Sequence, residues 1–177
     1  MQQTNLYTVT IPPLTKALTA LKGILEKAKA HTDTKKLSWM DFEHALLTDK
    51  LVFNQFDFLK QVQVACDNVK GAAARLAEVE VPKHEDNEKT FDELVERIDK
   101  TLAFVATIKP EQIIGKEDIK INLSYWKDKH LTGFEYATEY VLPNFYFHLT
   151  TAYAILRKNG VDIGKDDYMG GLPLKDA

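Results

Sequence analysis

The chain has a single cysteine, Cys66, among 177 residues and therefore cannot form an internal disulfide. It lacks an uninterrupted apolar run of membrane-spanning length, and residues 1–13 lack the basic start and apolar stretch of a signal peptide. Its formal net charge of −3 provides no general attraction for nucleic acid or anionic lipid. We therefore expect a cytoplasmic protein that binds neither nucleic acid nor a membrane.

Complete catalytic motifs are also missing. The sequence contains no Gly-x-Gly-x-x-Gly run, no phosphate-binding loop and no Gly-x-Ser-x-Gly turn around a nucleophile. It contains no Glu-x-x-His pair, which a ferritin-like di-iron centre uses. Sequence motifs therefore leave the reaction, if there is one, unassigned.

The composition is that of an ordinary globular protein, with 45% hydrophobic and 28% charged residues. The length suits one domain, so we predict a single domain over residues 1–177, with residues 161–177 as a surface tail.

Apolar residues recur at three- and four-residue spacing in four long segments, which predicts an all-α bundle of four helices. The first helix ends near His31, and we expect Pro12 and Pro13 to kink or interrupt any extension towards the N-terminus. A short connecting helix follows Ser38. The other helices are expected over 55–79 after an Asn54 cap, from Thr90 to 109, and from Pro143 to a cap at Gly160.

One segment before the last helix alternates apolar and polar residues. The alternation over 119–125 predicts a strand, which returns at 130–132 after a turn at 127–129. Thr132 and Glu135 then have the spacing of a helix-capping pair. We therefore expect a small β-hairpin and a short helix before the last long helix.

The last helix carries the most informative polar residues. Asn144, His148 and Thr151 follow one another at four- and three-residue spacing, so their side chains share one stripe. An imidazole there can bind a metal, act as an acid or base, or hydrogen-bond a ligand. A histidine among aromatic residues can equally be a satisfied core residue, and the spacing does not decide between these readings.

The last helix resembles that of the DinB/YfiT-like superfamily of four-helix bundles, which contains metal-dependent proteins. In that superfamily two helical histidines lie four residues apart, and a Leu-Arg pair and a glycine follow the second. Here Asn144, His148, Leu156, Arg157 and Gly160 occupy those places. Segments 144–148, 151–153, 159–161 and 61–77 resemble an uncharacterised bacterial and fungal branch of the superfamily. The resemblance implies an up-down four-helix bundle with a connecting helix and a hairpin.

The resemblance also implies a departure from the metal site. Asn144 replaces the first histidine, and the expected third ligand, a histidine on the second long helix, is missing there. An amide is a poor ligand for zinc or nickel. His148 is the one remaining candidate ligand, so we expect a degenerate site, with a divalent metal as an open alternative. Asp67 remains available to form a weak site or a general-base pair with His148.

Two functions follow from these residues. The first is binding of a small ligand in a polar pocket. The second is a metal- or thiol-dependent transferase or hydrolase that uses His148 as base or as its one strong metal ligand, with Asp67 or Gln61 assisting. We also expect a homodimer, by analogy with the superfamily. The ligand-binding candidates are Gln61, Gln63, Asp67, Asn144, His148, Thr151 and Tyr153.

Overall fold

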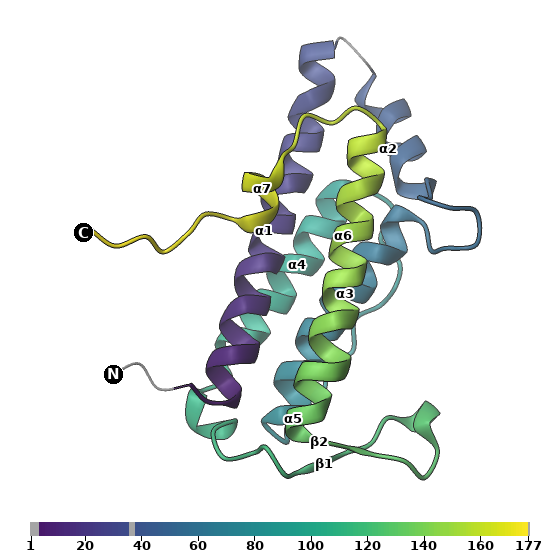
Figure 1. The fold of residues 1–177 in the computed structure, drawn as a ribbon. Coiled ribbons are helices and arrows are strands. Elements are labelled where there is room, and N and C mark those ends of the chain that lie inside the picture. Colours follow the sequence, from purple (N-terminus) through teal and green to yellow (C-terminus); the bar gives the residue numbers. More distant parts are fainter. Residues whose placement is uncertain (1–3, 36–37, 177) are drawn as a thin grey trace.

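Four long helices run side by side and enclose the core (Figure 1). The structure is a computed structural model that describes residues 4–35 and 38–176. Helix α3 packs against α6 and α4, and α1 packs against α4 and α6. This arrangement confirms the predicted helical bundle. The long helices are α1 (Leu6–Lys35), α3 (Phe58–Leu76), α4 (Phe91–Ala106) and α6 (Leu142–Lys158).

Helix α1 is longer than predicted and is assigned as one helix from Leu6 to Lys35, through Pro12 and Pro13. The expectation of an interruption there is wrong. Each proline removes one backbone donor, but Pro12 is exposed and Pro13 is half-buried, while Ile11 and Leu14 on the same helix are buried. The apolar contacts therefore hold the helix together across the two missing hydrogen bonds.

The helix starts agree only partly with the predicted caps. Ser38 precedes α2 (Trp39–Thr48) as expected, but its side chain makes no capping hydrogen bond. Asp57, and not Asn54, caps α3 by accepting a hydrogen bond from the Lys60 amide at 2.9 Å. Thr90 begins α4 with the predicted capping box.

The C-terminal end of α4 differs from the prediction, whereas that of α6 agrees with it. Helix α4 ends at Ala106, three residues earlier than expected, because Thr107 and Ile108 donate to carbonyls only three residues back. Helix α6 ends as predicted: Gly160 has φ +83°, and the Val161 amide donates to the Leu156 carbonyl at 3.1 Å.

The predicted hairpin is present but shorter than expected. Strand β1 (Lys120–Ile121) pairs antiparallel with β2 (Leu131–Thr132), with Lys120 opposite Thr132. The Asn122 side chain donates to the Lys127 carbonyl at 3.0 Å and to the Lys129 carbonyl, so it takes the place of further strand pairing. A 3₁₀ turn, η2 (Ser124–Trp126), follows, and another, η1 (Pro110–Gln112), precedes the hairpin.

The chain becomes helical again well before Pro143, where the sequence predicted a new start. Thr132 and Glu135 form the predicted capping box at α5 (Gly133–Glu135), and a π-helical segment, η3 (Tyr136–Val141), leads directly into α6. Pro143 thus falls beside the junction of π and α hydrogen bonding, where its missing donor is tolerated.

The C-terminal segment is more ordered than a tail. Val161 and Ile163 are buried, and a short helix, α7 (Lys165–Met169), packs against α1 (Figure 1). In the described part of the chain, none of the helices is long and apolar enough to cross a membrane.

Candidate functional site

A row of polar pairs crosses the contact between α3 and the helical stretch formed by η3 and α6. The α3 members are seven residues apart and therefore lie on one face of the helix. Polar groups in a helix contact are costly unless paired, and each here has a partner. We call this row the polar seam; it consists of Gln61–His148, Asn68–Asn144 and Arg75–Tyr136, at 2.7, 2.9 and 3.1 Å.

The first pair fixes the imidazole of His148. The Gln61 side-chain nitrogen donates to the Phe56 carbonyl at 3.0 Å, so the Gln61 oxygen faces the ring and accepts from His148 Nδ1. Phe56 also stacks on the imidazole, with ring centroids 6.4 Å apart. Burial lowers the pKa of His148 from its usual value of 6.5. His148 is therefore an oriented imidazole that is neutral at pH 7, and its Nε2 makes no hydrogen bond to any residue that the structure describes.

The second pair joins two amides. The Asn144 nitrogen donates to the Asn68 oxygen at 2.9 Å, and the Asn68 nitrogen donates to the Val64 carbonyl at 3.0 Å. These bonds fix both amides and leave the Asn144 oxygen as an acceptor. The position that resembles a metal-binding histidine thus carries a hydrogen-bonding group.

The third pair depends on a glycine inside α3. Arg75 Nη1 donates to the Tyr136 hydroxyl at 3.1 Å. A Cβ atom added at Gly71 would lie 2.3 Å from Arg75 Nη1, so the guanidinium occupies the space that a side chain at Gly71 would fill. Glycine inside a helix costs about 1 kcal/mol relative to alanine. Gly71 therefore lets Arg75 fold back along α3 towards the seam.

A small cavity of about 150 Å³ opens beside the second and third pairs. Taking about 30 Å³ for each water molecule, it would hold about five waters. Two of its tyrosines, Tyr136 and Tyr140, come from the π segment, and the hydroxyls of Tyr125 and Tyr140 hydrogen-bond to each other. The lining residues are Val64, Asp67, Asn68, Arg75, Leu123, Tyr125, Tyr136, Tyr140 and Asn144.

Tyr125 and Tyr136 of this cavity remain protonated at neutral pH. Burial and the hydrogen bond to Tyr140 raise the pKa of Tyr125. Burial also raises the pKa of Tyr136, although the nearby Arg75 guanidinium opposes this shift. Both hydroxyls therefore keep their protons and can act as hydrogen-bond donors.

Comparisons with known proteins place the sequence in a family. A family model described as a domain of unknown function, DUF1993, matches residues 6–169. The chain belongs to the DUF1993 family. A crystal structure of a DinB family member protein from Shewanella denitrificans is similar to this DUF1993 protein, with 41% sequence identity and a TM-score of 0.90. The match covers 97% of this chain and 96% of that chain, and no curated protein matches. The expected DinB-like family and fold are confirmed.

In the described residues of the DUF1993 protein, Asp67 makes no hydrogen bond to His148, so the structure does not bring together the general-base pair that the sequence suggested. Asp67 Oδ1 instead accepts from Arg97 Nη2 at 2.9 Å and from Lys70 Nζ at 2.8 Å. Both cations are buried, and their two ion pairs hold the carboxylate of Asp67 in place.

Three other predicted residues of the DUF1993 protein also lie outside the seam pairs. Gln63 donates to Glu88 at 2.8 Å, and Thr151 donates to the Phe147 carbonyl at 2.7 Å. The Tyr153 ring packs edge-on against Tyr168 of α7, with centroids 5.6 Å apart. The structure therefore brings Gln61 together with His148, and Asn144 with Asp67 at the cavity.

The residues of this DUF1993 protein do not fit the metal site of the superfamily. The structurally described residues contain no group of three or more His, Cys, Asp or Glu side chains that could hold a metal ion. His148 Nδ1 is committed to Gln61, and the neighbouring positions carry the two amides of Asn68 and Asn144. The amides bond to each other, so the seam offers hydrogen bonds and no set of metal ligands.

Sequence reasoning missed Asn68, Arg75, Tyr125, Tyr136 and Tyr140 as site residues. One available signal was the seven-residue spacing of Gln61, Asn68 and Arg75, which places three polar side chains on one face of the helix. The tyrosines gave a weaker signal, because the π segment and the hairpin that bring them together leave no clear mark in the sequence.

Proposed function

We propose that the protein binds a small oxyanion, a carboxylate or a phosphate group, in the cavity of the polar seam. Arg75 is the group that carries the proposal. It lines the cavity and makes no ion pair with a carboxylate in the described part of the chain. Guanidinium groups bind carboxylate and phosphate oxygens through paired N–H donors.

The absence of a side chain at Gly71 supports the view that Arg75 is positioned for a function. A glycine inside a helix lowers its stability, and Gly71 is compatible with the observed Arg75 position because a side chain there would meet the guanidinium. Sites of this kind commonly give up some stability to place a functional group.

The carboxylate of Asp67 also lines the cavity, but Arg97 and Lys70 pair with it and balance its charge. The other polar lining groups suit a small polar molecule with an anionic end. Tyr136 accepts from Arg75 and keeps its own proton to donate, and the Tyr125–Tyr140 pair has one further hydroxyl proton. The Asn144 oxygen offers an acceptor nearby. The small volume favours a ligand such as acetate, glycine or inorganic phosphate over a nucleotide.

A thermal-shift titration with acetate, glycine and phosphate tests the proposal. At 100 times the dissociation constant, a ligand specific for the folded state stabilises it by about 2.7 kcal/mol, which corresponds to a rise in melting temperature of roughly 5–10 °C. We expect at least one probe to give such a rise, and Arg75→Gln to abolish it.

The control is Lys109→Gln, which removes an exposed positive charge away from the cavity. It should leave the shift unchanged, whereas Tyr136→Phe should weaken it. Equal shifts in the wild type and Arg75→Gln, or no shift with any of the three probes, would refute the proposal. Residence in the cytoplasm remains a prediction from the sequence.

A further inference from the structure

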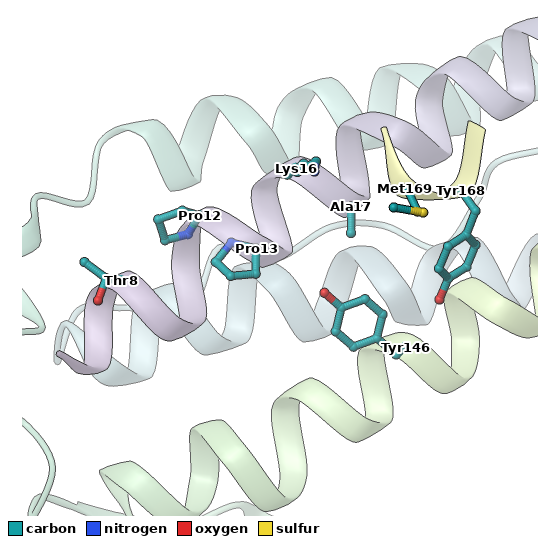
Figure 2. A pocket seen from close by; sticks show the side chains of 8 residues that line it. All are labelled: Thr8, Pro12, Pro13, Lys16, Ala17, Tyr146, Tyr168 and Met169. Carbon is teal, nitrogen blue, oxygen red and sulfur yellow. The ribbon is translucent and has the colours of Figure 1, made fainter. Parts of the chain in front are cut away.

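A second cavity lies on a different face of the bundle, between α1, α6 and α7 (Figure 2). Its volume is about 490 Å³, which is within the range of small-molecule sites. Its walls are mostly apolar and include Pro12, Pro13 and Ala17 of α1 and Met169 of α7. Figure 2 shows the Tyr146 ring reaching from α6 towards α1, between Pro13 and Tyr168.

The C-terminal segment forms one wall of this cavity and is held there by polar contacts to α1 and α6. Asp167 accepts from Lys27 of α1 at 2.5 Å, and the Tyr168 hydroxyl is 2.9 Å from the Thr150 hydroxyl on α6. Gly170 follows α7 with φ +63°, and a Cβ atom there would lie 3.0 Å from the Ala20 Cβ. The segment is thus held to both neighbouring helices, so the cavity has a defined shape.

The polar groups at the cavity are incompletely paired. The Tyr146 hydroxyl makes no hydrogen bond to any residue of the described ranges, although its ring is half-buried. Pro12 and Pro13 have no N–H, so the Thr8 and Val9 carbonyls lack their usual helical donors. Lys16 lines the cavity and makes no ion pair with the carboxylates that the structure describes.

The charge of the lining selects a class of ligand. Lys16 is its one charged residue, and none of the lining residues is acidic. An ammonium at the edge of an apolar cavity favours a molecule with one negative group and an apolar body. The Tyr146 hydroxyl can donate to the same negative group.

We infer that this cavity binds an amphipathic monocarboxylate, with the carboxylate at Lys16 and Tyr146 and the apolar body against Pro12, Pro13 and Met169. This site is separate from the seam cavity, and the inference does not depend on the function proposed for Arg75.

Calorimetric titration with octanoate tests this inference, with acetate as a probe that has the charge without the apolar body, and octanol as one that has the body without the charge. We expect octanoate to bind more tightly than both. Lys16→Gln should weaken octanoate binding by about tenfold or more, and Tyr146→Phe by about threefold to tenfold, because each loses one hydrogen bond to the ligand.

Two matched variants complete the test. Lys165→Gln removes an exposed charge from α7 that does not line the cavity, and Arg75→Gln disables the seam site. Both should bind octanoate as the wild type does. Loss of octanoate binding in Arg75→Gln with no effect of Lys16→Gln, equal binding of octanol, or no octanoate binding at all would overturn the inference.

Discussion

Replacing Gly71 by alanine should separate the stability of α3 from the placement of Arg75. An alanine Cβ at this position would lie 2.3 Å from Arg75 Nη1, which is too close for two nonbonded atoms. The guanidinium is the end of a flexible side chain, so it is expected to move and to lose its hydrogen bond to Tyr136. The helix backbone, by contrast, should accept alanine without strain.

The size of the effect follows from two opposing contributions. Alanine in place of glycine stabilises a helix interior by about 1 kcal/mol. Loss of a hydrogen bond that involves a charged group costs about 1.5–3 kcal/mol, with the lower end expected here because Arg75 is partly exposed. Gly71→Ala alone should therefore destabilise the protein by roughly 0.5–2 kcal/mol.

In the Arg75→Ala background the same substitution should have the opposite sign. Without the guanidinium, the nearest of the remaining contacts is the Tyr136 hydroxyl at 3.9 Å, an ordinary contact distance. Gly71→Ala should then stabilise the protein by about 1 kcal/mol, or roughly 2–4 °C in melting temperature.

Urea unfolding of the wild type, both single variants and the double variant measures this coupling as a double-mutant cycle. An equal gain from Gly71→Ala in both backgrounds would refute the reasoning, because it would mean that the guanidinium does not lie over Gly71. The seam function has its own consequence: Gly71→Ala should also remove the thermal shift produced by the oxyanion probe.

Three further predictions concern other parts of the molecule. Burial lowers the pKa of His148, so the stability that the neutral imidazole contributes is full above pH 6.5 and is lost as the pH falls below it. The free energy of unfolding, measured with urea, should therefore fall less between pH 7 and pH 5 in His148→Gln than in the wild type. An equal fall in the two proteins would contradict this. Burial raises the pKa of Cys66 to about 12, so a thiol reagent at pH 8 should label it only in denaturant; rapid labelling of the folded protein would show that the thiol is accessible. Leu51, Val52, Phe53 and Phe56 are all exposed, Phe53 at 91%, so we expect the predicted homodimer to form through this segment. Phe53→Asp should then give monomers in sedimentation, whereas a monomeric wild type at micromolar concentration would reject the dimer.

The helices of this fold were readable from the sequence because burial imposes a regular spacing on apolar residues. The four long helices overlap the segments that the pattern predicts, and the Thr90 and Gly160 caps are where it places them. The errors occurred where a nonlocal contact outweighs a local preference. Pro12 and Pro13 lie inside α1 because buried leucines and isoleucines on both sides hold the helix against its neighbours.

The site was less predictable than the fold. The sequence suggested Gln61, Asn144 and His148, and these three residues do belong to the polar seam. It did not indicate that Asp67 would pair with Arg97, because that ion pair joins α3 to α4. The sequence does not specify how the loop between these helices places one against the other. Arg75 was overlooked for the same reason, since its role depends on Tyr136, which lies 61 residues further along the chain.

The π segment η3 explains how a small change in chain length could create or remove this site. Each residue of an α-helix turns the chain by about 100°. Deleting one residue between Tyr136 and Val141 would let the helix continue in ordinary α form, and it would rotate Tyr136 by about that angle relative to α6. The bundle would retain its core, but Arg75 would face a different side chain. Relatives whose helix lacks the extra residue are therefore expected to share the architecture without the Arg75–Tyr136 pair.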